Sequence, residues 1–266
     1  MGAEPLRNLS VGVNASYLWG GYTKYVTNTY SDAYVNTLQR TYTAEARSYK
    51  LDFGLQYTQP LSAKDQVTLG LTYSLGHSLN ADPELSVIKN NSQLAVADTT
   101  RFRISNALDL PHTFGVGAVY NHNGQLMVGA DYQLQKWGSL DYPQYSDQGG
   151  YGLQSGLLKD RHKVVLGADY CRGERHRGFL SRLHYRAGIG YATPYFTING
   201  QDGPKEISAS LGLGIPIVNS YNNRSMLNIS AQWVRREASS MLTENTFRIN
   251  IGFTFNERMF AKFKVE

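Results

Sequence analysis

The sequence predicts an all-β protein: a transmembrane antiparallel up-and-down β-barrel of about ten strands, with residues 1–266 forming a single domain. Three observations predict this fold. Apolar and polar residues alternate in ten segments, most of these segments span about 9 to 11 residues with their ends included, and the connections between them are long and short in turn. Strands of soluble proteins average about 5 to 6 residues, whereas outer-membrane strands need about 9 to 11.

The alternation is free of errors in the last segment, Phe247–Asn256, where every second residue is apolar. A period of two gives a strand one apolar and one polar face. The ten expected strands, in chain order, are Leu9–Trp19, Tyr49–Tyr57, Val67–Leu75, Phe114–Tyr120, Leu126–Leu134, Val164–Tyr170, Leu183–Tyr191, Ile207–Ile217, Leu227–Trp233 and Phe247–Asn256.

The connections between these strands provide a second, independent signal. A membrane meander has short turns on the periplasmic side and long loops outside, and an even number of strands places both termini in the periplasm. The expected long connections are Gly21–Ala44, Gly76–Pro111, Gly138–Arg161, Thr193–Pro204 and Arg236–Asn245. The expected short ones are Ser62–Lys64, Asn121–Asn123, Arg172–Gly178 and Asn219–Ser225.

A Gly-x-x-Tyr pattern recurs six times and supports two aromatic girdles, one at each lipid–water interface. Glycine and tyrosine have opposite parity in this pattern, so we assign the tyrosines to the apolar face; the alternative is that tyrosine simply favours strands. Because strand direction alternates, one girdle is expected to hold Tyr57, Tyr120 and Tyr170, and the other Tyr73, Tyr132 and Tyr191.

Composition excludes several other classes. No run approaches the ~18 to 20 apolar residues of a spanning helix, and an apolar content of 41% is too high for a disordered chain. The single cysteine, Cys171, excludes an intramolecular disulfide, and a net charge of +5 without a basic run gives no reason to expect nucleic acid. The start Met1–Pro5 lacks the features of a signal peptide, so we expect a mature or truncated piece of an exported protein.

The polar face of the strands is expected to line the lumen. Its charges can form a paired plug that props the barrel open, or they can form a polar path or binding site. The expected inward-facing charged or titratable residues are Lys50, Asp52, Asp131, Lys163, Asp169, Arg182, His184, Arg186, Glu206 and Arg248.

No catalytic, cofactor or metal site is predicted. The histidines expected near the extracellular rim are His77, His112 and His162, and no spacing pairs any of them with Asp109 or Asp160. The sequence also lacks a Gly-x-Ser-x-Gly elbow, a phosphate loop and a metal-type histidine cluster.

Several motifs lie between about Leu108 and Phe255, over somewhat more than half of the chain. They are Leu108–Gly117, Gly129–Tyr132, Trp137, Asp160–Lys163, Tyr185–Gly188, Tyr191–Pro194 and Phe247–Phe255. On these residues the sequence resembles the C-terminal half of the FadL/TodX family of transporters for hydrophobic compounds, and the ending Phe255–Phe260 resembles barrels of Bacteroidetes-type bacteria. The resemblance implies an outer-membrane location, but that family has fourteen strands and an N-terminal hatch with an Asn-Pro-Ala motif, which this sequence lacks. The chain is therefore a shorter relative or part of a fourteen-stranded barrel.

The sequence thus predicts a bacterial outer-membrane barrel, in contact with membrane lipid and lipopolysaccharide, that passes or binds small hydrophobic solutes without catalysis. The solutes implied by the resemblance are fatty acids or aromatic hydrocarbons. The alternatives are a closed structural or adhesive barrel with partner-binding loops and, less favoured, an outer-membrane hydrolase. Pro111 cannot donate a ladder hydrogen bond, so a gap in the strand pairing is expected at Leu108, Pro111 and His112. The resemblance implies that such a gap is a lateral opening in the wall, and the alternative is an ordinary strand start at the rim.

Overall fold

The computed structural model describes residues 8–28, 37–91, 96–146, 150–174, 176–198, 200–218, 224–239 and 242–254. Each of the ten expected strands is present among the sixteen described strands, which confirms the predicted antiparallel all-β class. The expected residues Phe255–Asn256 and the ending Phe255–Phe260 lie outside the described residues. The ten strands are β1 (Leu9–Asn28), β2 (Thr37–Pro60), β3 (Asp65–Ser74), β6 (Thr113–His122), β7 (Leu126–Gln135), β10 (Arg161–Tyr170), β11 (His184–Ala192), β14 (Lys205–Val218), β15 (Arg224–Glu237) and β16 (Glu244–Thr254).

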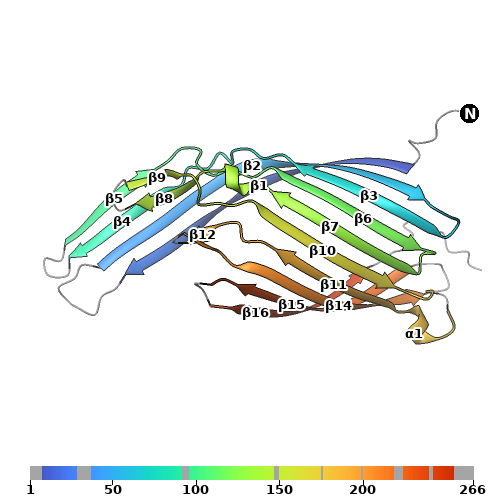
Figure 1. Ribbon diagram of the computed structural model, residues 1–266. Coiled ribbons are helices and arrows are strands. Elements are labelled where there is room, and N and C mark those ends of the chain that lie inside the picture. The colour runs from blue at the N-terminus through green and yellow to red at the C-terminus, as the bar shows by residue number, and fades with distance from the viewer. Residues whose placement is uncertain are drawn as a thin grey trace, which may run out of the picture.

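The ten strands form one antiparallel meander. Each pairs with its predecessor and its successor among the ten, in the order β1-β2-β3-β6-β7-β10-β11-β14-β15-β16. The sheet curls, so that β3, β6 and β7 form its upper wall and β14, β15 and β16 its lower wall (Figure 1). Among the described ladders none joins β1 to β16, so the structure shows a rolled sheet with two free edges.

The strands turn their apolar side chains outward. In β6, Phe114 and Val116 are 47% and 49% exposed, while the intervening Gly115 and the next residue Gly117 are less exposed. The same alternation runs through β10 and β11. A protein that folds in water does not expose a continuous apolar band, whereas hydrocarbon favours it. The outer surface of the sheet is thus built to face lipid.

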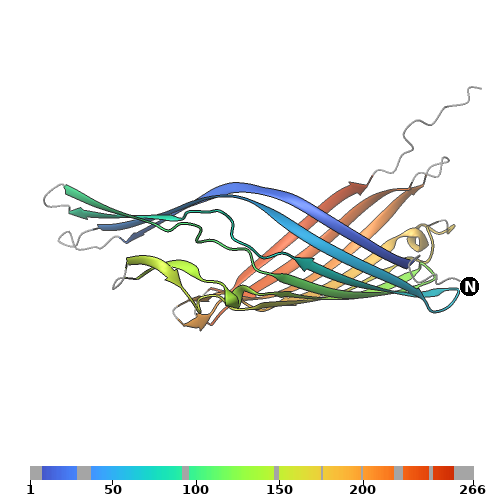
Figure 2. The ribbon, with the colours of Figure 1, turned by 90° about the horizontal axis from the view of Figure 1, so that it is seen from above.

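The first long connection is predicted wrongly. The segment Gly21–Ala44 is mostly strand, because β1 continues to Asn28 and β2 begins at Thr37. These two strands have 20 and 24 residues, about twice what a membrane requires, and they project beyond the other strands of the meander, with β4 (Glu84–Asn91) paired to the extension of β2 (Figure 2). The extensions are rich in tyrosine, threonine and valine, which favour strands whether lipid or water lies outside.

The other long connections carry small hairpins and one turn of helix. The described residues contain no helix long and apolar enough to cross a membrane. These added elements are β4 (Glu84–Asn91), β5 (Val96–Arg103), the 3-10 helix η2 (Trp137–Ser139), β8 (Tyr142–Ser146), β9 (Gly150–Gln154), β12 (Thr197–Ile198) and β13 (Gln201–Asp202).

The connection between β10 and β11 is longer than expected. The predicted strand start at Leu183 is one residue early, and the predicted lumen-facing Arg182 ends a short helix, α1 (Phe179–Arg182), instead of lying on a strand. The alternation of Leu183, Tyr185 and Ala187 begins before the ladder does. It therefore could not show that the pairing of β11 with β14 starts only at His184.

Orientation can be tested on β16. Ile251 is 72% exposed on the outer face, and Asn250 points to the other face. We expect Ile251→Arg to lower the free energy of unfolding by about 2 to 4 kcal/mol, because it places a charge in hydrocarbon, and Asn250→Arg to cost far less. Denaturant titrations in lipid vesicles measure both. Equal losses at the two positions would contradict the assignment of the faces.

Candidate functional site

The inner face of β2, β3, β6 and β7 is a polar wall with a hollow in it. A Cβ added at Gly115 would lie 2.2 Å from Thr72 Oγ1, and one added at Gly117 would lie 2.2 Å from Asp131 Oδ1. These glycines therefore allow the neighbouring polar side chains to lie flat across the next strand. The hollow measures about 370 Å³, and its inward-facing lining includes Gln56, Thr68, Gly70, Thr72, Gly115, Gly117, Asp131 and Gln133.

The same arrangement, in which a glycine on one strand lies opposite a short polar residue on the next, continues on β11 and β14. A Cβ at Gly188 would lie 3.0 Å from Ser210 Oγ, and one at Gly190 would lie 2.7 Å from Ser208 Oγ. Ser210 donates a hydrogen bond to the carbonyl oxygen of Gly188 at 3.5 Å. Much of the inner wall is thus lined by short polar groups that lie against the backbone.

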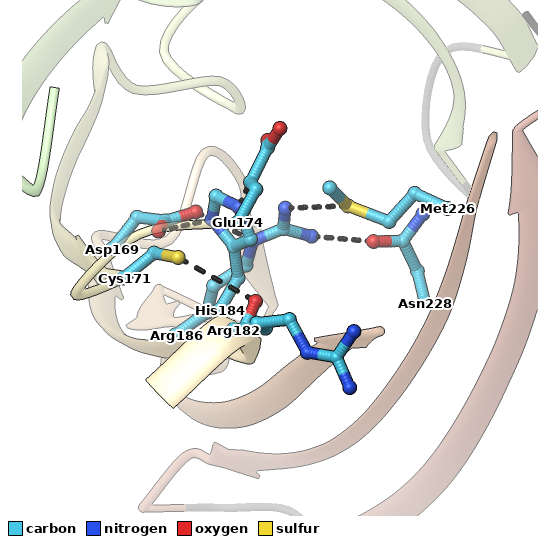
Figure 3. Close-up of polar contacts among 8 residues, drawn as sticks. All are labelled: Asp169, Cys171, Glu174, Arg182, His184, Arg186, Met226 and Asn228. Atoms are coloured by element: carbon cyan, nitrogen blue, oxygen red, sulfur yellow. Dashed lines mark hydrogen bonds and ion pairs between the residues drawn. The ribbon is translucent and has the colours of Figure 1, made fainter. Parts of the chain in front are cut away.

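Three of the expected inward residues come together near the short-turn end of the sheet (Figure 3). Asp169 Oδ1 lies 2.8 Å from His184 Nδ1, and Asp169 Oδ2 accepts a hydrogen bond from Arg186 Nε at 2.7 Å. Asp169 is on β10 and the other two residues are on β11, where Asp169 and Arg186 are cross-strand partners. This cluster therefore ties two neighbouring strands along the wall.

Arg186 extends the cluster over β14 to β15. Its two terminal nitrogens donate to Asn228 Oδ1 at 2.7 Å and to Met226 Sδ at 3.4 Å (Figure 3). A Cβ at Gly214 would lie 3.3 Å from Arg186 Nη2, so a larger residue there would crowd the guanidinium. Asn228 and Met226 were missed by the sequence analysis. The parity of β15 could have shown that they face inward, but only the register shows that they lie within reach of Arg186.

The connection that follows β10 covers the end of this cluster. Glu174 Oε1 lies 3.5 Å from His184 Nε2, too far and too poorly aligned for a hydrogen bond but close enough for an ion pair when the imidazole is protonated. Cys171 is buried, and its thiol donates to the carbonyl oxygen of Arg182 at 3.5 Å (Figure 3). Arg182 thus meets the cluster through its backbone.

The remaining expected lumen residues lie elsewhere on the wall. Lys50 and Asp52 form an ion pair of 2.7 Å on β2, and Ser74 donates a hydrogen bond to Asp52 at 2.5 Å. Asp131 lines the hollow, and Arg248 on β16 lies opposite a glutamine of β15. The charges are therefore distributed as separate wall-bound groups, and the described contacts do not join them into one plug.

The Leu-Pro step of Leu108–His112 lies directly before β6, at the long-loop end. The strand ladder does stop there, since Pro111 has no N–H to donate. Backbone hydrogen bonds nevertheless join the step to the segment that follows β3. These bonds run from Leu110 N to His77 O (2.8 Å), from Leu79 N to Leu108 O (2.8 Å) and from Ala107 N to Ala81 O (3.0 Å).

Asp82 binds the residues that precede the Leu-Pro step. It accepts hydrogen bonds from Asn106 N at 2.9 Å and from the Arg103 guanidinium at 2.7 Å. The Asn106 N–H, and after it Arg103, lower the pKa of the Asp82 carboxyl. Because the folded pKa is lowered, this fastening is complete above the ordinary aspartate pKa of about 4 and is lost as the pH falls through the folded value.

This linkage predicts the effect of removing the guanidinium. In Arg103→Gln, we expect the pKa of Asp82 to rise part of the way toward its ordinary value, because the Asn106 N–H still stabilises the carboxylate. Carboxyl chemical shifts followed by NMR across a pH titration measure this. An Asp82 that titrates identically in the variant and the parent would show that the Arg103 contact does not form in solution.

The histidines of the long-loop end are bound to hydroxyl groups and not to the acids that the sequence places nearby. His112 Nδ1 lies 2.8 Å from Tyr73 Oη, and His162 Nδ1 lies 2.7 Å from Tyr132 Oη, while His77 Nε2 lies 3.0 Å from Ser48 Oγ. Among the described contacts, none joins these histidines to Asp109 or Asp160 by a hydrogen bond or ion pair. The part of the chain that the structure describes also holds no group of three or more metal-type ligands.

Comparison with solved structures identifies the class of fold. The CymD monoaromatic hydrocarbon channel matches with a TM-score of 0.63 and 14% identity, over 96% of this chain and 71% of that one. The Ralstonia pickettii toluene transporter TbuX matches with a TM-score of 0.62 and 15% identity, over 94% of this chain and 64% of that one. A Pseudomonas aeruginosa FadL homologue matches with a TM-score of 0.58 and 16% identity, over 87% of this chain and 56% of that one.

The chain therefore has the fold of FadL-type channels, and the likeness includes the first strands as well as the half that the sequence resemblance covers. It spans 56% to 71% of the length of these three neighbours. The family model described as BamG matches residues 1–266, and the chain belongs to the BamG family. No curated protein matches it.

The polar cluster can be tested by a double-mutant cycle on Asp169→Ala and Arg186→Met. We expect a coupling energy of about 1 kcal/mol in the free energy of unfolding, because the pair is charge-assisted and partly buried. The pair Glu206 and Arg236, at 3.2 Å and with Arg236 more exposed, is the matched control, with an expected coupling of about 0.5 kcal/mol or less. Coupling no larger than in the control would mean that the cluster does not stabilise the wall.

Proposed function

We propose that this protein is an outer-membrane channel that passes or binds small hydrophobic solutes, of the fatty-acid or aromatic-hydrocarbon class, without catalysis. The observation that carries the proposal is the overlap of its fold with a monoaromatic hydrocarbon channel over 96% of the chain. The neighbours described above are channels or transporters and not enzymes, which favours transport over the hydrolase alternative.

The chemistry of the inner wall is compatible with an apolar solute. Several of its polar side chains satisfy one another: Thr58 and Thr68 are 3.1 Å apart at their hydroxyls, and Ser74 donates to Asp52. A polar group that already has a partner loses little when a solute displaces water from it. Glycines in the hollow keep bulky side chains out of the path. These features favour the passage of a small apolar solute along the wall.

A second candidate is a closed structural barrel whose loops bind a partner. The hairpin of β8 and β9 packs its tyrosines against the extension of β2. The Arg40 guanidinium lies 4.6 Å from the centre of the Tyr145 ring, and the rings of Tyr42 and Tyr151 meet edge to face at 6.3 Å. Burial raises the pKa of Tyr151, as it does for a hydroxyl in a packed surface. Such an ordered aromatic platform suits a partner surface.

Permeation into vesicles separates the two candidates. We expect the purified protein to accelerate the entry of toluene or a long-chain fatty acid into lipid vesicles, and Gly117→Trp to slow that entry because the indole fills the hollow of about 370 Å³. Ile189→Trp, a bulky change on the exposed outer face of β11, is the control. Entry no faster than in empty vesicles would contradict the channel and favour the closed barrel.

A further inference from the structure

The outer face of the sheet carries two exposed tyrosine–histidine pairs at its long-loop end. His112 pairs with Tyr73 across β3 and β6, and His162 pairs with Tyr132 across β7 and β10. Phe114, two residues after His112, lies opposite Leu134, which in turn lies opposite His162. The two histidines therefore lie on either side of β7, two strand spacings apart and offset from each other by two residues along the strands.

The hydrogen bonds fix which nitrogen of His112 faces outward as a donor. The backbone N–H of Gly76 donates to His112 Nδ1 at 3.2 Å, and the Tyr73 hydroxyl lies 2.8 Å from the same atom. A nitrogen that accepts from a backbone N–H carries no proton of its own, so the proton of the neutral ring is on Nε2. Among the described groups, His162 Nδ1 contacts only the Tyr132 hydroxyl, at 2.7 Å, and its Nε2 carries the ring proton when that hydroxyl donates. The His112 ring thus presents an N–H donor above the apolar band, and the His162 ring does so in the tautomer in which Tyr132 donates.

An apolar groove of about 540 Å³ lies on the same outer face, between these pairs and the middle of the sheet. Tyr73 and Tyr132, the two tyrosines that hold the histidines, line its upper part. The other apolar side chains that line it are Phe53, Leu55, Leu71, Phe114, Val116 and Leu134. A second groove of about 580 Å³ on β11, β14, β15 and β16 has a similar apolar lining but no histidine, so the combination of groove and histidines distinguishes the first.

At the opposite rim a tyrosine and a histidine also lie close together, but both contact a carboxylate. His122 Nδ1 and Tyr120 Oη both contact Asp65 Oδ1 at 2.7 Å, so a carboxylate occupies the position facing that histidine. At the long-loop rim Asp160 is held by Lys136 and by the N–H of Gly138. A carboxylate therefore contacts the histidine at one rim, whereas hydroxyl groups contact the two histidines at the other.

We propose that this groove binds a phosphorylated lipid of the outer leaflet, with an acyl chain along the apolar lining and a phosphate at His112 and His162. The proposal rests on the outer-membrane location given under the proposed function. Phosphate oxygens are strong acceptors for the N–H donors that the two histidines offer. The acyl chain fills a groove whose depth and apolar lining match hydrocarbon better than water.

Binding of diphosphorylated lipid A to the delipidated protein in non-ionic detergent, measured by native mass spectrometry, tests the site. We expect the double variant His112→Phe/His162→Phe to bind about tenfold more weakly, since it keeps two aromatic rings and removes both donors. His122→Phe at the opposite rim is the matched control and should bind like the parent. Dephosphorylated lipid A should bind the parent and the double variant equally.

A groove variant provides an independent readout. Val116→Trp should weaken binding of both lipids because the indole occupies the path of the acyl chain, whereas Leu211→Trp in the second groove should not. Retained folding is checked by heat-dependent electrophoretic mobility. Unchanged affinity in the folded double variant, or an equal loss in His122→Phe, overturns the proposal. Solute entry into vesicles is a separate measurement, so a protein that passes no hydrocarbon can still bind the lipid, and the two proposals fail independently.

Discussion

The requirement that governs this structure is that backbone N–H and C=O groups in hydrocarbon must be hydrogen-bonded within the protein. A meander of neighbouring antiparallel strands meets that requirement with short turns, and the ladders from β2 to β15 do so along their membrane-spanning length. The side chains are then free to differ by face: the apolar residues that a soluble protein would bury are exposed here, as at Leu166 and Ile189. The polar residues turn to the other side, and the inner wall follows from that division.

The ten strands could be predicted from the sequence because one period of two marks both the strand and its two faces. The same signal could not show where the membrane ends. The extensions beyond Trp19 in β1 and before Tyr49 in β2 remain strand because their β-branched and aromatic residues pair well in water too. Arg182 shows the opposite failure: it has the right parity for β11, but the ladder begins two residues later, at His184.

Several residues of the candidate site could be predicted from the sequence, but the contacts that they make could not. The parity of Asp169, His184 and Arg186 places them on the inner face, and their adjacency follows from β10 and β11 being consecutive. Asn228 joins them only because β14 carries Gly214 beneath the guanidinium, which depends on a register that alternation leaves open. The pairing of inward glycines with serine or threonine on the next strand likewise becomes visible only once the register is known. This pairing keeps the wall flat, and a flat wall leaves space for a solute.

The same backbone requirement bears on the two edges of the sheet. Among the ten strands of the meander, β1 and β16 are the two whose described ladders join one neighbour only, and their apolar faces are among the most exposed, as at Trp19 and Phe247. In hydrocarbon, a free edge leaves alternate N–H and C=O groups without partners. With ten strands in an up-and-down order, the first and the last run in opposite directions. They can therefore pair directly with each other, or an even number of further strands can lie between them; an odd number would force a parallel pair into an otherwise antiparallel wall.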